Sequence, residues 1–435
     1  MDSPLSPPPA TDRGPVLDFD HYSPEFNADP AAAWKALKDT PFAWSERNGG
    51  FWVVSDHQGN YDVLRDHEAF SSAPAASGAT TLVIPIGGFE MGSPEDEPHW
   101  PQALDPPYHG QVRSLLNRPL APRAVRRLQP LIEYWATTCV NKVIEAGSCD
   151  LLYDVTGPVP AYITLDWLGF PHDKIIAAAQ SFHDLVGYPP GSEEFNRALE
   201  NDIIRQTLWE TCEARRSEPR DDLISWLMTQ ELDGEPLSDR VIVRLGYIIV
   251  AGGVDTTTSL AASALVHLNR DRELRQRLIE DPALIESATE EFLRVYPPLA
   301  SIGRVATRDT EYRGHEVREG DRVLVSWQAA NTDERVFDSP EEFRADRFPN
   351  PHVSFGLGPH RCAGSHLARL MFAETLRQVL RRMPDYEIDS GAIAPYPSRG
   401  IFNGWASLPA RFTPGTREPA GEAPPRDGRP SGRPS

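Results

Sequence analysis

The sequence is poor in cysteine and in positive charge. Its 435 residues include four cysteines, at positions 139, 149, 212 and 362, and these form neither a Cys-x-x-Cys pair nor the spacing of a metal finger. This favours a reduced protein of the cytoplasm over one stabilised by disulfides.

Positive charge is outnumbered by negative charge. Lysine and arginine number 43 against 63 aspartate and glutamate, which gives a formal net charge of -20. Nucleic acid is therefore not an expected partner, because phosphate binding requires a basic surface.

Long apolar runs are also lacking. The chain starts Met1-Asp2-Ser3-Pro4 without an apolar signal segment, and its longest apolar window, residues 247–265, is interrupted by Asp255 and by several Thr and Ser residues. We interpret this window as a core helix rather than a membrane span, and we expect no membrane partner.

Low-complexity sequence is confined to the two ends. Residues 1–16 are rich in proline and residues 413–435 in proline and glycine, so both are predicted to be disordered tails. No linker divides residues 17–412, which we expect to form one catalytic domain, long enough to enclose a cofactor. We expect a monomer.

One cysteine lies in a glycine-rich loop. Residues 355–364 read FGLGPHRCAG and precede an amphipathic pattern that predicts a helix over residues 366–382. Glycines at 356, 358 and 364 are expected to adopt positive φ, and the helix start is expected to lower the pKa of Cys362 and keep its sulfur anionic. The alternative is a buried structural cysteine in a tight turn.

This pattern, Phe-Gly-x-Gly-x-His-x-Cys-x-Gly, resembles the haem-ligand signature of the cytochrome P450 family. The resemblance extends over residues 19–412, and within the family the chain is similar to soluble bacterial members of the camphor-hydroxylase type. It implies a mainly α fold with small β-sheets enclosing a thiolate-ligated haem b (iron protoporphyrin IX), with Cys362 as the metal ligand. Phe355, His360 and Gly364 are the matching cofactor-binding positions in the loop.

A predicted long helix over residues 239–269 carries the second motif. Gly252 and Gly253 each cost roughly 1 kcal/mol relative to alanine inside a helix, which suggests that something approaches the backbone there. With Asp255 and Thr256, they match the family's [Ala/Gly]-Gly-x-[Asp/Glu]-Thr motif, which implies room for O2 and proton delivery by the acid and the alcohol. The alternative is a core helix whose threonines bond back to carbonyls.

Further positions follow from the resemblance. The Glu-x-x-Arg helix contains Glu291 and Arg294, and Arg347 is the third member of their haem-side core. Four cationic residues match positions that bind the haem propionates: His109, Arg113, Arg304 and His360.

Substrate is expected to lie against four mostly apolar segments, residues 82–91, 182–191, 299–302 and 401–402, which favours a hydrophobic substrate. The pocket residues predicted here are Ile249, Gly252, Gly253, Leu299, Ile302, Ile401 and Phe402. Short strands are expected near residues 51–54. A small hairpin is expected between residues 310 and 325, formed by residues 311–314 and 322–325.

The leading hypothesis is a monooxygenase that uses O2 and electrons from a separate ferredoxin or flavodoxin-type donor; we expect no fused reductase after Gly404. The donor would bind a basic surface around Arg118, Arg123, Arg126 and Arg361, although Arg127 and Arg369 belong to the same cluster and all of these could be ordinary solvated helix charges. The alternatives are a P450-type enzyme that uses peroxide, a non-catalytic haem-based gas sensor, and a thiol or zinc enzyme that uses Cys362.

Overall fold

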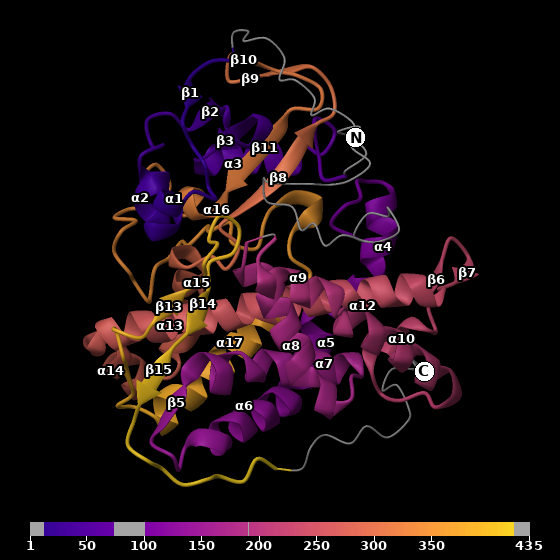
Figure 1. Ribbon diagram of the computed structural model, residues 1–435, viewed down its shortest axis with the longest axis vertical. Helices are drawn as coiled ribbons and strands as arrows, with labels where there is room; N and C mark the ends of the chain where they lie inside the picture. The colour runs from indigo at the N-terminus through magenta and orange to yellow at the C-terminus, as the bar shows by residue number, and fades with distance from the viewer. Residues whose placement is uncertain (1–12, 74–100, 190, 422–435) are drawn as a thin grey trace.

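The computed structural model describes residues 13–73, 101–189 and 191–421 of the chain. A large helical body lies against a smaller region that contains most of the sheet (Figure 1). This confirms the predicted mainly α architecture with small sheets. The α-helices are α1 Pro24–Ala28, α2 Pro30–Lys35, α3 His57–Arg65, α4 Tyr108–Asn117, α5 Pro122–Val125, α6 Gln129–Val143, α7 Pro158–Leu168, α8 His172–Gly187, α9 Glu193–Glu200, α10 Ile203–Ser217, α11 Leu223–Leu227, α12 Asp239–Gly253, α13 Asp255–Arg270, α14 Arg272–Glu280, α15 Leu284–Val295, α16 Trp327–Ala330 and α17 Ser365–Arg382.

The main sheet has the strand order β1-β2-β3-β11-β8-β4. Its strands are β1 Val16–Leu17, β2 Phe42–Ser45, β3 Phe51–Val54, β4 Phe70–Ser71, β8 Ser301–Ala306 and β11 Arg322–Ser326. The strand predicted at residues 51–54 is present. The predicted hairpin is wrong in its pairing, because β9 Thr310–Tyr312 pairs with β10 His315–Val317, whereas β11 pairs with β8 and β3. Short segments can pair with distant strands, which local patterns do not reveal.

Smaller sheets complete the fold. They are formed by β5 Ser148–Asp150, β12 Glu387–Ile388 and β15 Pro409–Arg411, by β13 Ala394–Pro395 with β14 Trp405–Ser407, and by β6 Glu231–Leu232 with β7 Glu235–Pro236.

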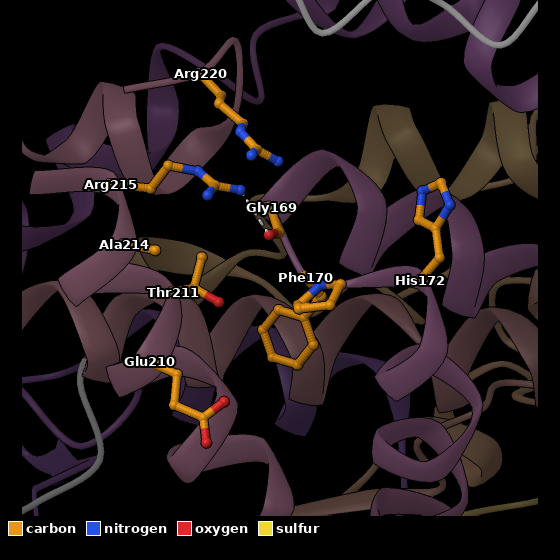
Figure 2. Close-up of a pocket in the computed structure, with 9 residues that line it drawn as sticks. Gly169, Phe170, His172, Glu210, Thr211, Ala214, Arg215 and Arg220 are labelled. Carbon is orange, nitrogen blue, oxygen red and sulfur yellow. Dashed lines mark hydrogen bonds between the residues drawn. The ribbon is translucent and has the colours of Figure 1, made fainter. Parts of the chain in front are cut away.

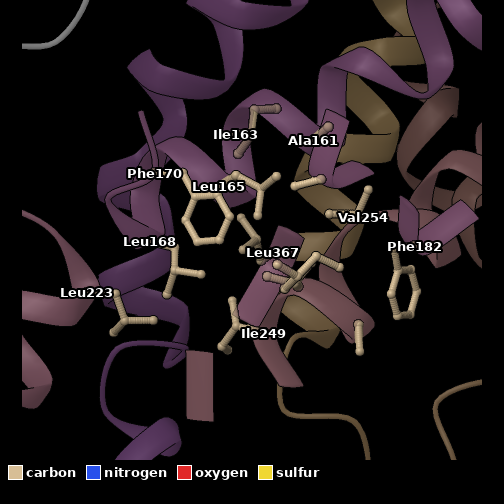
Figure 3. Close-up of a cluster of buried hydrophobic side chains, with 14 of the residues drawn as sticks. Ala161, Ile163, Leu165, Leu168, Phe170, Phe182, Leu223, Ile249, Val254 and Leu367 are labelled. Carbon is tan, nitrogen blue, oxygen red and sulfur yellow. The ribbon is translucent and has the colours of Figure 1, made fainter. Parts of the chain in front are cut away.

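The core of the helical body is built around α12 and α17. One buried hydrophobic cluster contains Ile249, Val254, Leu367 at the start of α17 and Phe182 of α8, together with residues of α7 (Figure 3). Burying aliphatic side chains of this size contributes roughly 1.5–3 kcal/mol each. This packing fixes the start of α17, and with it the preceding cysteine loop, against the middle of the long apolar segment.

The long segment is two helices rather than one. The structure breaks the predicted 239–269 helix at Val254, whose φ and ψ are -92° and -73°, so that α12 ends at Gly253 and α13 begins at Asp255. Together they run end to end across the body (Figure 1). The stretch Asp239–Arg270 is long and apolar enough to cross a membrane, but 72% of its apolar window is buried, as expected of a core helix.

The structure brings the three predicted haem-side residues together in the interior. Arg294 Nη2 lies 2.7 Å from Glu291 Oε1, and Arg347 Nε lies 3.0 Å from the same oxygen, with all three side chains buried. Burial alone would raise the pKa of Glu291, but hydrogen bonds from Arg294, the Arg344 backbone and Arg347 outweigh it and lower that pKa. The carboxylate thereby joins α15 to the segment before the cysteine loop.

Part of the predicted C-terminal tail is docked on the body. The Glu418 carboxylate accepts hydrogen bonds from Arg381 of α17, and its backbone pairs with the Asn141 side chain of α6. Arg382 donates to the Thr416 carbonyl. The prediction of disorder is therefore wrong for residues 413–421, since a proline-rich segment can still be held by charged side chains that are distant in sequence.

At the N-terminal end, Arg13 forms an ion pair with Asp321, so residues 13–16 are also part of the body. The other predicted tail residues, 1–12 and 422–435, lie outside the described residues.

Replacing Glu291 by Gln should lower the free energy of unfolding by about 3–5 kcal/mol, because two buried guanidinium groups lose their counter-charge. Denaturant unfolding measures this change. Glu286→Gln on the exposed face of the same helix is the control and should shift the free energy by less than about 0.5 kcal/mol. Equal effects of the two substitutions would contradict the assigned role.

Candidate haem-thiolate site

The cysteine loop is closed by its own backbone. The Cys362 N–H donates to the Phe355 carbonyl at 2.7 Å, and Gly356 and Gly358 both adopt a φ of 66°. A side chain at Gly358 would lie 2.5 Å from the Leu64 carbonyl, so the loop also packs closely on the end of α3. The expectation of positive φ at Gly364 is wrong, since its φ is -82° and it caps α17.

The Cys362 sulfur is both desolvated and accessible. Its side chain is exposed, yet burial of the thiol raises its pKa, against the opposing effects of the Gly364 N–H and of Arg113, Arg361 and Arg369. The prediction that the helix start lowers this pKa is therefore wrong for the protein alone, because desolvation exceeds the helix-end contribution. A group that is deep in the protein but not covered faces an internal space. Coordination to a metal would remove the proton from such a thiol.

The predicted propionate-binding residues converge near this space. The His109 and His360 rings lie 4.2 Å apart, and each ring has a buried Nε2 without a hydrogen-bond partner among the described residues. Arg304 of β8 is buried and donates only to the Gly303 carbonyl among the contacts of the described residues. Desolvation, aided by Arg304 and His109, lowers the pKa of His360 to about 2, and desolvation lowers that of Arg304 to about 10. Asp105, the nearest acid acting on Arg304, accepts hydrogen bonds from Ser71 and Ser72.

These residues fit a haem. Cationic groups that are buried without anions, and imidazole nitrogens without partners, require acceptors such as two carboxylates. A methyl group added to Gly110 or Gly364 would meet nothing within 4 Å, which indicates open space beside both helix starts. Arg113 is placed differently from the other three, because it donates to the Arg361 carbonyl and to Asn117, so it also braces the cysteine loop.

The two glycines of the long segment have different surroundings. A side chain at Gly252 would meet nothing within 4 Å, whereas one at Gly253 would lie 2.7 Å from Thr164 of α7. Gly252 thus borders open space, while the missing side chain at Gly253 permits close packing of α12 against α7. Thr256 donates to the Gly252 carbonyl at 2.7 Å, the carbonyl back-bond that the alternative interpretation anticipated.

Asp255 is buried and makes contacts that sequence reasoning missed. His183 of α8 and Tyr396, just after β13, both touch its carboxylate. They lie 72 and 141 residues away in the chain, and neither belongs to a motif. His183 does fall in the predicted substrate segment 182–191, which is the one signal that pointed toward it.

Two of the four predicted substrate segments meet. Leu299 and Phe402 form an isolated β-bridge, and the Ala300 N–H donates to the Ile401 carbonyl at 2.6 Å. Leu299 and Ile401 pack against the core cluster that contains Ile249 and Phe402. Ile302 lies on β8, two residues before Arg304. Of the others, Phe182 is fully buried in the core, and residues 82–91 lie outside the described residues.

A separate cleft of about 550 Å³ lies between the α7–α8 turn and α10 (Figure 2). Arg215 in its wall donates to Asp222 and to the Gly169 carbonyl. None of the predicted site residues line it, so we do not connect it with the chemistry of Cys362. Its lining residues are Gly169, Phe170, Pro171, His172, Glu210, Thr211, Ala214, Arg215 and Arg220.

Comparison with known proteins places these residues in a family context. The family model described as cytochrome P450 matches residues 191–384. The steroid C26-monooxygenase of Mycobacterium tuberculosis strain H37Rv is 32% identical over 394 residues, which cover 88% of this chain and 94% of that protein.

Two solved structures give the same result. The cytochrome P450 PksS of the Bacillus subtilis bacillaene polyketide synthase has a TM-score of 0.80 at 25% identity, covering 91% of this chain and all of its own. A Bacillus megaterium P450, CYP109E1, in complex with corticosterone has a TM-score of 0.76 at 25% identity, covering 89% of this chain and all of its own.

The two glycines should respond oppositely to alanine. Gly252→Ala should maintain or raise the free energy of unfolding, by up to roughly 1 kcal/mol, because alanine favours the helix and meets no neighbour. Gly253→Ala should lower it by about 1–3 kcal/mol, because its methyl group overlaps Thr164. Denaturant unfolding of both variants measures these changes. A greater loss of unfolding free energy in Gly252→Ala than in Gly253→Ala would contradict the different surroundings assigned to the two glycines.

Proposed function

This chain belongs to the cytochrome P450 family and is a monooxygenase, and from that premise we propose that it oxidises an apolar small molecule with electrons from a separate ferredoxin- or flavodoxin-type donor. In the overall reaction a substrate C–H bond, O2, two electrons and two protons give C–OH and water. The observation that carries the proposal is the uncovered Cys362 thiol in a loop whose neighbours Arg304 and His109 are buried and, like His360, have no anion bonded to them among the described residues.

The residues around that space have separate tasks. Cys362 would hold the iron of haem b, and the propionates would accept from His109, Arg304 and His360, with Arg113 bracing the loop. When bound, the haem would supply the activation of O2. Asp255 and Thr256 would hold and pass on the two protons, since Asp255 is buried directly before Thr256, whose hydroxyl donates to the Gly252 carbonyl. Their joint presence favours reaction with O2 over the peroxide-using and gas-sensing alternatives.

An apolar substrate is supported by the side chains that border the site. One hydrophobic cluster contains Ile249 and Phe402, and Leu299 and Ile401 pack on it. A relative is named for oxidation of steroids, and a solved neighbour is bound to corticosterone. We therefore propose a steroid-sized, largely hydrocarbon ring system as the substrate class.

The electron donor would bind on the face of the cysteine loop. α5 packs against α17. The pKa of His366 is lowered mainly by desolvation and further by the positive charges of Arg369, Arg361 and Arg126, so Arg126 and Arg361 both lie near this histidine. Arg118, Arg123, Arg126 and Arg361 are exposed, whereas Arg369 is paired with Glu290. An acidic ferredoxin or flavodoxin would complement this patch on an otherwise acidic protein. The unpaired cysteines and buried α12–α13 stretch fit a cytoplasmic location.

The monooxygenase proposal is tested with the reduced, carbon monoxide-bound protein and with Thr256→Ala. The parent should show the Soret band of thiolate-ligated haem, and Cys362→Ala should lose it. Thr256→Ala should keep that band but release hydrogen peroxide in place of much of the product, because proton delivery loses its alcohol. Product per electron supplied is the measurement, and an unchanged yield would refute the role of Thr256.

Charge reversal tests the donor surface. Arg126→Glu should raise the donor concentration needed for half-maximal reduction several-fold at low salt, and the difference should shrink as salt screens the patch. Arg277→Glu, an exposed change on α14, should leave that concentration unchanged. A similar response from both variants would place the donor elsewhere.

A further inference from the structure

Two side chains, those of His183 and Tyr396, contact the Asp255 carboxylate. His183 Nδ1 lies 3.0 Å from Oδ1, and the Tyr396 hydroxyl lies 2.9 Å from Oδ1 and 2.7 Å from Oδ2. The hydroxyl is also 2.9 Å from His183 Nδ1, so the three groups close a triangle. Asp255 is 2% exposed, His183 7% and Tyr396 2%. The carboxylate therefore has no direct access to bulk water.

Tyr396 is fixed in position by glycines on both sides of its ring. A side chain at Gly187 would lie 2.8 Å from the ring, one at Gly404 would overlap it, and the Tyr396 N–H donates to the Gly404 carbonyl at 3.0 Å. Burial, followed by the adjacent Asp255 carboxylate, raises the pKa of Tyr396 well above its usual range. Its hydroxyl consequently stays protonated and serves as a donor to the carboxylate, not as a source of protons.

Of the two side chains that contact Asp255, His183 is the histidine, the residue type that serves as a proton shuttle in proteins. Because Nδ1 faces a carboxylate, that nitrogen carries the proton and donates it to Asp255. Nε2 is buried and has no hydrogen-bond partner within the described part of the chain.

Other ionisable groups surround the histidine. The Tyr153 ring lies 6.2 Å from the imidazole, and on its own helix Asp184 accepts from Arg197 of α9 and from Gln180. Asp184 is thus already paired, and Asp255 is the acid directly opposite the ring.

We propose that His183 is the positioning residue that loads Asp255 with protons, and that Tyr396 holds the accepting carboxylate for this transfer. The imidazolium gives its Nδ1 proton to Asp255 Oδ1 and becomes a neutral imidazole that keeps its other proton on Nε2. Asp255 passes the transferred proton toward Thr256. The ring is recharged when Nδ1, turned away from the carboxylate, takes up a proton from solvent. The inference rests on the proposed function, since it assigns the source of protons for that reaction.

The main test is the pH profile of coupling, measured as product per electron in the donor-driven reaction. In the parent protein this yield should fall as pH rises through the His183 titration. That titration is measured by NMR of ring-labelled histidine in the reduced, carbon monoxide-bound form. His183→Gln should lower the yield on the order of tenfold, flatten the profile and increase the solvent isotope effect, because glutamine retains a donor but carries no proton to transfer.

Two further variants keep the test decisive. His172→Gln is the matched control, since it removes a histidine of the same helix whose Nε2 contacts Asp166 at 2.7 Å, and it should leave the profile unchanged. Tyr396→Phe removes one hydroxyl, and it should lower the yield while preserving the dependence on pH. Asp255→Asn should lower the His183 midpoint in the NMR titration, independently of turnover.

The outcomes separate the two proposals. If the parent turns over but His183→Gln matches it in yield and profile, or if the parental yield rises with pH, His183 does not load Asp255 and the inference is overturned. If the parent lacks the thiolate spectrum or forms no product, the proposed function itself fails, and the inference fails with it. If His183→Gln does not fold, an unchanged His183 midpoint in Asp255→Asn or an unchanged yield in Tyr396→Phe overturns the inference.

Discussion

The site depends on one sulfur that is held inside the protein and left uncovered. Desolvation works against an ionised Cys362 thiol, and the nearby arginines and the helix start do not compensate for it in the protein alone. The loop still cannot move away, because its backbone is closed on Phe355 and packed against the end of α3. A rigid, desolvated thiol beside open space is poorly stabilised by itself and well suited to a metal, since coordination replaces the proton.

Two groups of buried ionisable residues in this protein differ in whether their charges are paired. Glu291 shows a completed buried cluster, in which one carboxylate accepts from two guanidinium groups and these groups also donate to backbone carbonyls. Arg304, His109 and His360 show an incomplete one, with cationic or cation-forming groups and no carboxylate hydrogen-bonded to them among the described residues. An isolated buried cation is costly, whereas a pair satisfied by hydrogen bonds is tolerated. The contrast within one protein distinguishes a structural cluster from a group of residues suited to binding an anion.

Sequence motifs located the chemistry better than they described its surroundings. The cysteine loop, the Glu291 helix and the Asp255-Thr256 pair could be placed because each is defined over a few adjacent residues. The separate surroundings of Gly252 and Gly253 could not, because Thr164 approaches one of them from 89 residues away. The docking of residues 413–421 escaped prediction for a related reason, since composition indicated disorder while Arg381 and Arg382 supplied specific partners. The sign of the Cys362 pKa shift was wrong because helix-end electrostatics are local and desolvation is a property of the whole fold.

The break at Val254 explains how the long segment can serve two purposes. A continuous helix would leave Asp255 in the middle of a turn, but the break puts it in the first turn of α13, where a negative charge is favoured by the helix dipole. The same break ends α12 at Gly253, directly after the open Gly252 position whose carbonyl accepts from Thr256. One local departure from helical geometry therefore places a buried acid against α8 and the adjacent alcohol against the open Gly252 position. In the proposed reaction, proton transfer between the two sides would need only the adjacent residues 255 and 256.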